Sequence, residues 1–317
     1  MSRLLVIRSE EYAPHLGVKD CIPAVEAAFR SLVEGRAEHP AKYHDRCPWG
    51  LWFYMGGHVF DQEAMAIKLG CAAAAGGSCQ VIYYDGATAE PKALLEGLRV
   101  THLRTGAAAA IGARWLARPE SRTVAVLGAG RVCWSSLEGL SALFALERVL
   151  VADVDPEATT RFVERGRGAF AFELAGATIE EAVGQADIVV SATPARAPLV
   201  ASSWVRPGTH FSAMGADGAG KQELDSDLHR RARVFCDSLD QCLKWGDINN
   251  TVKAGGLDRD GLAGELGAVI AGRVPGRLAA DDITVFDATG LGIQDAVVAR
   301  LIFDTAVRCG LGTWVEL

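Results

Sequence analysis

Short hydrophobic runs alternate with amphipathic stretches over residues 120–295. The runs have the length and bounding turns of strands, and the amphipathic stretches repeat with the period of helices. The predicted strands are Thr123–Leu127, Arg148–Asp153, Ala169–Leu174 (a weak signal), Asp187–Thr193, Thr209–Met214, Val234–Asp237 and Ile283–Asp287. The predicted helices between them include Val132–Phe144, Pro156–Arg165 and Ile179–Gln185. Repeated alternation of strand and helix is typical of a parallel sheet covered on both faces.

The two ends of the chain have a different pattern. Amphipathic periodicity predicts a helix over Val18–Glu34, and long helices are also predicted over Leu95–Leu116 and Leu291–Arg308. Three strands joined by glycine-rich turns are expected at Leu51–Tyr54, Ala66–Leu69 and Gln80–Tyr84. The sequence therefore predicts an α/β protein with a doubly wound parallel sheet over residues 119–296. A second α+β domain is expected from both termini, residues 1–118 and 297–317.

Composition narrows the class of partner. The 317 residues are 50% hydrophobic and carry a net charge of −7, which argues against nucleic acid and anionic membranes as partners. No apolar run reaches the roughly 18 residues that span a bilayer, and the N-terminus lacks the apolar core of a signal peptide. The eight cysteines form no CxxC pair and no Cys/His cluster, so we expect reduced thiols, no metal site and a cytoplasmic location.

The clearest motif is Val124-Ala-Val-Leu-Gly-Ala-Gly130, a strand that ends in Gly-Ala-Gly before a helix. Gly128 permits the sharp turn, and Gly130 lets the backbone approach a pyrophosphate. Ala129 lies between them. Arg131 follows Gly130 directly, and Val132 begins the predicted helix, whose free N–H groups face the phosphates. This order predicts a dinucleotide-binding site of the Rossmann type.

Asp153 ends the next predicted strand and bears on the choice of cofactor. A carboxylate there can accept hydrogen bonds from both ribose hydroxyls of an adenosine and repels a 2′-phosphate, and no arginine follows it closely. NAD is therefore favoured over NADP. The alternative is that Asp153 only caps the helix that begins near Pro156.

Two further strand ends belong to the same edge of the predicted sheet, where doubly wound folds bind ligands. Four residues at these ends are expected to line the cofactor: Ala192, Thr193, Met214 and Gly215. Asp217 follows in a glycine-rich loop with Lys221. Beside a nicotinamide, a carboxylate at this position can exchange protons with an amine or a water. The alternative is an ordinary turn aspartate.

Three cations are candidates for holding an acidic substrate. Arg104 lies in an apolar helix of small residues, where a charge must be paired or face a ligand, and guanidinium binds carboxylates through two hydrogen bonds. Lys68 lies on a predicted apolar strand, and Arg46 lies in a loop-like segment. The alternatives are a structural ion pair for Arg104, a solvent-directed side chain for Lys68 and a solvated charge for Arg46.

Together these segments resemble the ornithine cyclodeaminase/mu-crystallin family. The matching pieces are, in chain order, Lys68, Thr101–Ala107, Gly128–Gly130, Ala186–Pro194, Trp204–Gly208, Gly215–Asp217, Gly220–Asp225 and Phe286–Asp295. The resemblance implies a homodimer, an NAD(P)-binding domain and a substrate-binding and dimerisation domain made from both chain ends. It also implies that Asp217 is the general acid/base, that Lys68 acts in the same site, and that other residues surround substrate (Arg46, Arg104, Lys221, Thr289 and Gly290) or cofactor (Thr105).

Members of this family act in amino-acid metabolism and move hydride between nicotinamide and the α-carbon of an amino or imino acid. The expected function is thus an NAD-dependent amino-acid dehydrogenase or imine reductase. A cyclodeaminase that recycles its NAD is the alternative, and a non-catalytic crystallin-like nucleotide-binding protein is a third reading. Ornithine cyclodeaminases carry a glutamate about a dozen residues before the lysine. Here that stretch, Trp52–Gly57, has no carboxylate, which favours a substrate without a distal ammonium group.

Overall fold

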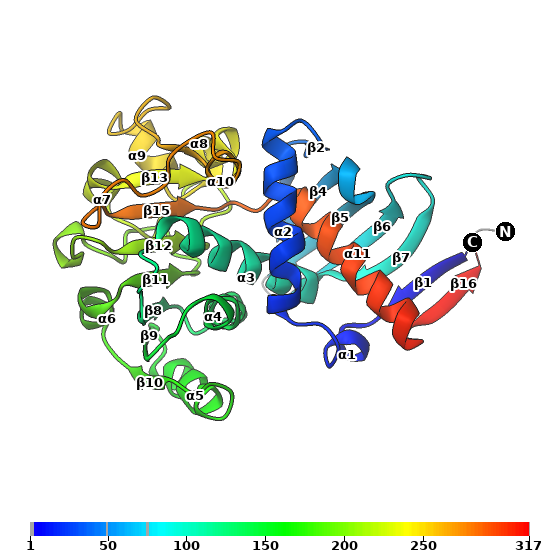
Figure 1. The fold of residues 1–317 in the computed structure, drawn as a ribbon, viewed down its shortest axis with the longest axis horizontal. Helices are drawn as coiled ribbons and strands as arrows, with labels where there is room; N and C mark the ends of the chain where they lie inside the picture. Colours follow the sequence, from blue (N-terminus) through cyan, green and yellow to red (C-terminus); the bar gives the residue numbers. More distant parts are fainter. Residues whose placement is uncertain (1–2, 49, 74–75, 317) are drawn as a thin grey trace. The chain divides into compact units, whose positions relative to one another are not determined.

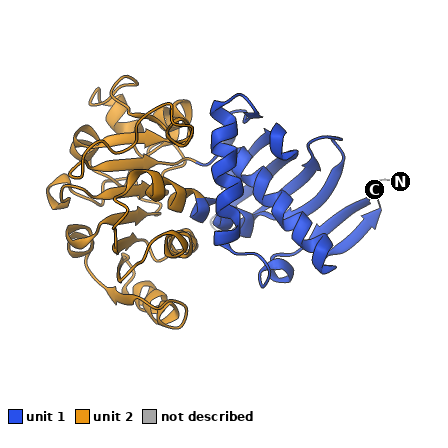
Figure 2. Ribbon diagram, viewed as in Figure 1, with its two compact units in different colours: residues 1–107, 290–317 blue, residues 108–289 orange. Residues whose placement is uncertain are grey.

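A computed structural model describes residues 3–48, 50–73 and 76–316. The chain divides into two compact units, residues 1–107 with 290–317 and residues 108–289 (Figure 2). The expected boundaries at 118/119 and 296/297 are displaced: the junctions lie earlier in the chain, at 107/108 and 289/290. The first junction falls inside helix α3 (Gly97–Leu116), and the second falls just before helix α11 (Gly292–Cys309).

The first unit contains an eight-stranded sheet with strand order β16-β1-β7-β6-β5-β4-β2, and β3 pairs with β4. Its strands are β1 (Arg3–Ile7), β2 (Ala37–Glu38), β3 (Tyr43–Cys47), β4 (Gly50–Val59), β5 (Ala64–Ala73), β6 (Gly76–Asp85), β7 (Pro91–Glu96) and β16 (Thr313–Glu316). Its other helices are α1 (Ser9–Tyr12), α2 (Val18–Val33) and the 3-10 turn η1 (Phe60–Gln62). Helix α11 packs against β4 and β5, and α2 packs against α11 (Figure 1).

The strands β4, β5 and β6 are longer than the predicted ones because they form a continuous antiparallel meander with one face buried under α11. Alternation of buried and exposed residues along β5 matches this arrangement. The predicted helix at Leu95–Leu116 begins two residues late in the sequence, at Gly97, because Leu95 belongs to β7 and pairs with Val81.

The second unit contains an eight-stranded parallel sheet with order β10-β9-β8-β11-β12-β15-β13-β14. Its strands are β8 (Thr123–Leu127), β9 (Arg148–Ala152), β10 (Glu173–Gly176), β11 (Ile188–Ser191), β12 (His210–Ala213), β13 (Arg233–Cys236), β14 (Gly264–Glu265) and β15 (Thr284–Asp287). Its helices are α4 (Arg131–Leu143), α5 (Pro156–Arg167), α6 (Ile179–Gln185), η2 (Ser202–Trp204), α7 (Ser226–Arg231), α8 (Leu239–Trp245), α9 (Asn249–Lys253) and α10 (Leu266–Ile270).

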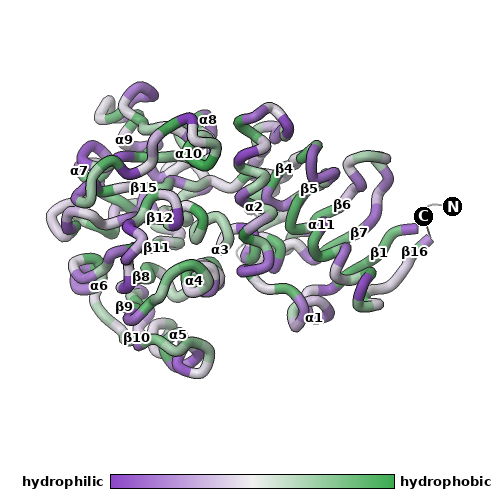
Figure 3. Tube along the Cα trace, viewed as in Figure 1, coloured by the Kyte–Doolittle hydropathy of each residue, from purple (hydrophilic) through white to green (hydrophobic). Residues whose placement is uncertain are grey.

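This strand order runs outward from β8 to β10 in one direction and from β11 to β12 in the other, which confirms the predicted doubly wound fold. The central strands are buried along nearly their whole length, as apolar parallel strands require (Figure 3). The weakly signalled strand at Ala169–Leu174 is displaced. Strand β10 is Glu173–Gly176, because its pairing with β9 starts at Arg148 opposite Glu173.

Among the described residues, no helix is both long and apolar enough to cross a membrane. The same residues hold no group of three or more His, Cys, Asp or Glu side chains arranged to bind a metal ion.

Candidate active site

A cavity of about 510 Å³ lies at the carboxyl ends of the strands β8, β9 and β11 in the second unit. Its lining includes Gly128, Gly130, Asp153 and Thr193. Gly128 has a φ of +97°, a backbone conformation that is strained for residues with a side chain. A Cβ at this position would also lie 2.9 Å from the carbonyl oxygen of Ala192. The turn therefore needs glycine both for its conformation and for the space beside the cavity.

Helix α4 begins at Arg131 with Gly130 at its N-cap, and within the described residues no side chain caps it. Val132 follows in the first turn, so the backbone N–H groups of this turn are available for an anion such as a pyrophosphate. Ala129 donates its backbone N–H to Oδ2 of Asp153 at 2.6 Å. The glycine turn and the end of β9 are thereby joined at the mouth of the cavity.

Asp153 follows the last residue of β9 and accepts a second hydrogen bond, from the backbone N–H of Asp155 at 2.9 Å. The alternative reading, in which Asp153 caps the next helix, is wrong. The N-cap of α5 is Asp155, whose side chain accepts the N–H of Glu157 at 2.9 Å. Asp153 lines the cavity instead, where a ribose would meet it.

The ends of β11 and β12 supply the other residues expected around the cofactor. Ala192 and Thr193 directly follow β11 and line the cavity. Met214 directly follows β12, and its N–H donates to the carbonyl oxygen of Ser191 at 2.8 Å. Gly215 is the next residue. The structure thus brings these four residues together at one edge of the sheet.

In the first unit, Lys68 and Arg104 flank one buried carboxylate, that of Asp295 on α11. The Lys68 ammonium lies 2.9 Å from Oδ1 of Asp295 and 3.2 Å from the hydroxyl of Thr101. Nε of Arg104 lies 3.8 Å from the same oxygen, and its guanidinium donates to Gln294 at 3.2 Å. The expected alternative for Lys68, a side chain directed to solvent, is wrong because the residue is only 3% exposed.

This cluster carries two cations and one anion, so one positive charge is not balanced within it. Burial lowers the pKa of Lys68, and the negative charge of Asp295 opposes that effect. Oδ2 of Asp295 accepts no hydrogen bond from the described residues. Gly290 lies against the Arg104 guanidinium, where a Cβ would come within 2.6 Å of it. The guanidinium thus packs directly against the backbone of Gly290, and a side chain at this position would displace it.

Asp217 lies in the loop after β12, and its side chain is 56% exposed. Its Oδ1 accepts a hydrogen bond from the Lys221 ammonium at 2.5 Å, and Lys221 also donates to the carbonyl oxygen of Gly215 at 3.2 Å. The two loop residues predicted to act on substrate are therefore an ion pair at the carboxyl edge of the parallel sheet.

The remaining candidates have separate surroundings. Arg46 lies on strand β3 rather than in the expected loop-like segment. Its side chain is exposed, which agrees with the alternative interpretation of Arg46 as a solvated charge. Thr105 is buried in α3. The hydroxyl of Thr289 donates to Oδ1 of Asp237 at 3.1 Å. One unit contains Lys68, Arg104, Arg46, Thr105 and Gly290, and the second unit contains the other candidates.

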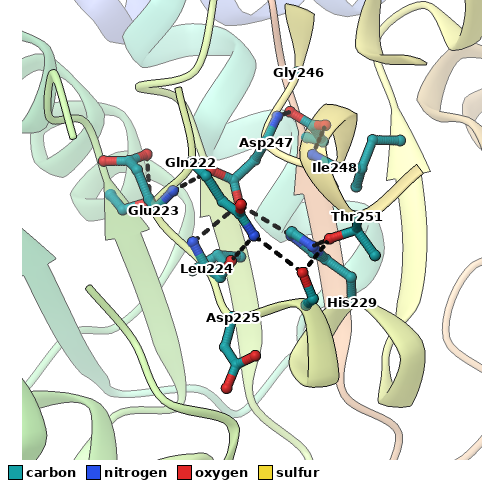
Figure 4. Close-up of polar contacts among 12 residues, drawn as sticks. Gln222, Glu223, Leu224, Asp225, His229, Gly246, Asp247, Ile248 and Thr251 are labelled. Atoms are coloured by element: carbon teal, nitrogen blue, oxygen red, sulfur yellow. Dashed lines mark hydrogen bonds and ion pairs between the residues drawn. The ribbon is translucent and has the colours of Figure 1, made fainter. Parts of the chain in front are cut away.

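Sequence reasoning missed a chain of buried carboxylates in the second unit. Asp247 accepts the backbone N–H groups of Glu223 and Leu224 at 2.5 and 3.0 Å, and its Oδ2 lies 3.0 Å from Nε2 of His229 (Figure 4). Asp287 in turn accepts the N–H of Asp247 at 2.9 Å. Burial, reinforced by the negative charge of Asp247, raises the pKa of Glu223 to about 7.

The stability of the protein should respond to Glu223. Its folded pKa lies above the ordinary value, so ionisation is disfavoured in the folded state and stability falls as pH rises toward about 7. The quantity to measure is the difference in the free energy of unfolding between the wild type and Glu223→Gln. We expect this difference to fall by about 3 kcal/mol between pH 4.5 and 7.5. Urea titrations of both proteins across that range measure it. A difference that does not change with pH contradicts the assignment.

Comparison with known proteins places these sites in context. Residues 5–310 match the ornithine cyclodeaminase/mu-crystallin family. The chain is 33% identical to an alanine dehydrogenase of Archaeoglobus fulgidus, with 98% of both chains covered. It is similar to the structure of Thermococcus litoralis Delta(1)-pyrroline-2-carboxylate reductase with NADH and L-proline (TM-score 0.94, 30% identity, 98% of this chain and 99% of that one). An archaeal alanine dehydrogenase dimer with bound NAD has TM-score 0.95 at 32% identity, with 99% of each chain covered.

The family match and the similar proteins cover nearly the whole chain. The protein therefore belongs to the ornithine cyclodeaminase/mu-crystallin family.

Proposed function

We propose that this protein is an NAD-dependent oxidoreductase that transfers hydride between nicotinamide and the α-carbon of a small amino or imino acid. The observation that carries the proposal is the buried pair of cations, Lys68 and Arg104, around Asp295. Its one unbalanced positive charge matches the single α-carboxylate of an amino acid. The related alanine dehydrogenase and the reductase bound to L-proline both have names that indicate such substrates.

The roles of the two units follow from what each contains. We assign cofactor binding to the parallel sheet, with Gly128, Ala129, Gly130, Arg131 and Val132 at the pyrophosphate. We assign the substrate carboxylate to the unit built from both chain ends. When bound, NAD would supply the hydride acceptor. The protein would supply the cations Lys68 and Arg104, which orient the carboxylate of the substrate. The Asp217 side chain would take the proton from the substrate amine.

NAD is proposed in preference to NADP because of the cavity wall. The Asp153 carboxylate lies where an adenosine ribose would bind, and the next residue, Val154, is a largely exposed aliphatic side chain. A 2′-phosphate would meet a like charge there, and the three residues directly after Asp153 (Val154, Asp155 and Pro156) supply no cation. The related structures contain NADH and NAD.

We also propose a homodimer, through the sheet face opposite α11. Five large hydrophobic side chains are exposed there on neighbouring strands, namely Tyr43, Trp52, Tyr54, Ile67 and Leu69. The rings of Tyr43 and Tyr54 stack with centroids 5.1 Å apart. A second copy would cover this apolar face, and the related alanine dehydrogenase is a dimer. A monomer mass in light scattering at micromolar concentration would refute this.

We propose that the protein acts in the cytoplasm, and the state of its cysteines supports this location. The seven cysteines whose side chains the structure describes are all free, and five of them are buried. Reduced, buried thiols suit a reducing compartment.

The direct test follows reduced nicotinamide by its absorbance. The purified protein is given NAD with L-alanine, L-proline or L-ornithine, and NADH with pyruvate plus ammonium or with pyrroline-2-carboxylate. The proposal expects net formation or consumption of NADH with at least one pair, and tighter binding of NADH than of NADPH in a fluorescence titration. Ammonia release from ornithine without net NADH would instead identify a cyclodeaminase.

A further inference from the structure

Glu223 connects the ends of two neighbouring strands of the parallel sheet. It is fully buried, and its carboxylate accepts hydrogen bonds from three groups. These are the Ser191 hydroxyl at 2.8 Å, the backbone N–H of Thr193 at 2.7 Å and the backbone N–H of Gly215 at 3.1 Å. Ser191 ends β11, and Gly215 lies two residues beyond β12. One side chain therefore fixes both strand exits through their backbones.

The packing around this carboxylate leaves little freedom. A Cβ on Gly215 would lie 2.6 Å from the carboxyl group of Glu223 and 2.6 Å from the backbone nitrogen of Thr193. The two loops and the carboxylate thus lie in direct contact. Thr193 lines the 510 Å³ cavity on its other side, so a shift of Glu223 would move the wall of that cavity.

A second layer holds Glu223 itself in place. Asp247 accepts the N–H of Glu223, and Oδ2 of Asp247 lies next to His229, whose other ring nitrogen lies 2.8 Å from the Thr251 hydroxyl (Figure 4). These residues come from the loops and short helices α7 and α9 beyond the sheet edge. The backbone of Glu223 is therefore anchored at a buried site from which its side chain reaches the two strand exits.

We propose that Glu223 is a positioning residue that sets the nicotinamide half of the cofactor site, acting through the backbones of Thr193 and Gly215. The proposal rests on the proposed binding of NAD. In a doubly wound sheet the first strand–helix–strand unit holds the adenosine half, here Gly128 to Asp153. The strands on the other side of the switch point, β11 and β12, hold the nicotinamide half.

This division predicts that a change at Glu223 weakens binding of the nicotinamide half more than binding of the adenosine half. Glu223→Gln keeps the size of the side chain, but its NH₂ group cannot accept the N–H of Thr193 or Gly215. The adenosine half should change less, because the Asp153 carboxylate accepts its hydrogen bonds from the backbones of Ala129 and Asp155 rather than through Glu223. The two halves can be compared by measuring NADH against ADP-ribose, which lacks the nicotinamide.

The experiment measures the dissociation constants of NADH and ADP-ribose by calorimetry for the wild type and three variants. Glu223→Gln should weaken NADH binding by about tenfold, the effect of losing roughly one buried hydrogen bond, and leave ADP-ribose within about twofold. Ser191→Ala removes one hydrogen-bond donor to Glu223, so it should also weaken NADH binding, but by a smaller factor. It also serves if Glu223→Gln fails to fold.

Asp187→Asn is the matched control. Asp187 also accepts hydrogen bonds from two backbone N–H groups, those of Arg122 and Thr123 at 3.0 Å, and from the guanidinium of Arg118. It lies at the opposite end of β11, just before the first residue of the strand. The variant Asp187→Asn should lower the stability of the protein without changing the ratio of the dissociation constants of NADH and ADP-ribose. An unchanged ratio in Glu223→Gln, or in Ser191→Ala if the first variant does not fold, overturns the proposal. Equal weakening of both ligands also overturns it. Failure of the wild type to bind either ligand would refute the proposed NAD site instead.

Discussion

Asp217→Asn is expected to lower kcat by at least about a hundredfold, with NADH binding and thermal stability close to those of the wild type. Asparagine keeps the shape of the side chain but cannot take a proton from an amine as hydride leaves the α-carbon. Asp217 follows the exit of β12 by a few residues and is more than half exposed in a polar loop, so its loss should not disturb the core. Steady-state kinetics with the substrate found in the absorbance screen measure the effect.

The control for this variant is a second exposed aspartate. Asp240 forms an ion pair with Arg259 in the same unit, so Asp240→Asn also removes one exposed ion pair. Such pairs contribute little to stability, and kcat should stay near the wild-type value. If Asp217→Asn retains kcat within about threefold of the wild type, proton transfer belongs to another group.

Arg104→Ala is expected to raise KM for the amino or imino acid by roughly 30-fold to a few thousandfold. This range corresponds to about 2–5 kcal/mol for removing one partner of a buried charge pair. Arg104 is buried next to Asp295 and Gln294, so its guanidinium has little water to replace a lost substrate contact. The dissociation constant of NADH should change by less than about twofold, because the cofactor does not depend on this charge.

Arg99→Ala provides the comparison on the same helix. Arg99 lies over the Tyr12 ring, 5.8 Å from its centroid, and reaches the carbonyl oxygen of Leu16. Its loss should affect stability alone. If Arg104→Ala lowers the melting temperature and leaves KM unchanged, Arg104 serves only to balance Asp295, as the structural alternative holds.

Much of the parallel domain could be predicted from sequence because its signals are local. Strand β8 and helix α6 have the predicted bounds, and β9 ends one residue before the predicted Asp153. A buried parallel strand is a continuous apolar run, and Gly128 marks a turn that few other residues can form. The displaced β10 shows the limit, because its position depends on pairing with β9 rather than on its own residues.

The partners of the candidate site residues were harder to predict, since they lie far apart in the chain. Lys68 is a candidate substrate-binding cation from the sequence, but its counterion Asp295 lies 227 residues away. Asp247 gave no signal, and Asp287 was noted only as the end of a predicted strand and as part of the Phe286–Asp295 motif. The partners of both are largely backbone N–H groups, which every residue but proline carries. Glu223 belonged to a recognised motif, yet its contact with two strand ends appears only once β11 and β12 are paired.

The pairing of Lys68 with Asp295 also has a consequence for biosynthesis. Helix α11, which covers β4 and β5, leaves the ribosome only after the whole parallel domain has been made. The contiguous domain of residues 108–289 can fold as soon as it emerges, whereas the meander made earlier must wait with the underside of its sheet uncovered. A helix made after the parallel domain thus completes the unit whose strands were made before it. The exposed meander is the part of the nascent chain that most needs protection from aggregation.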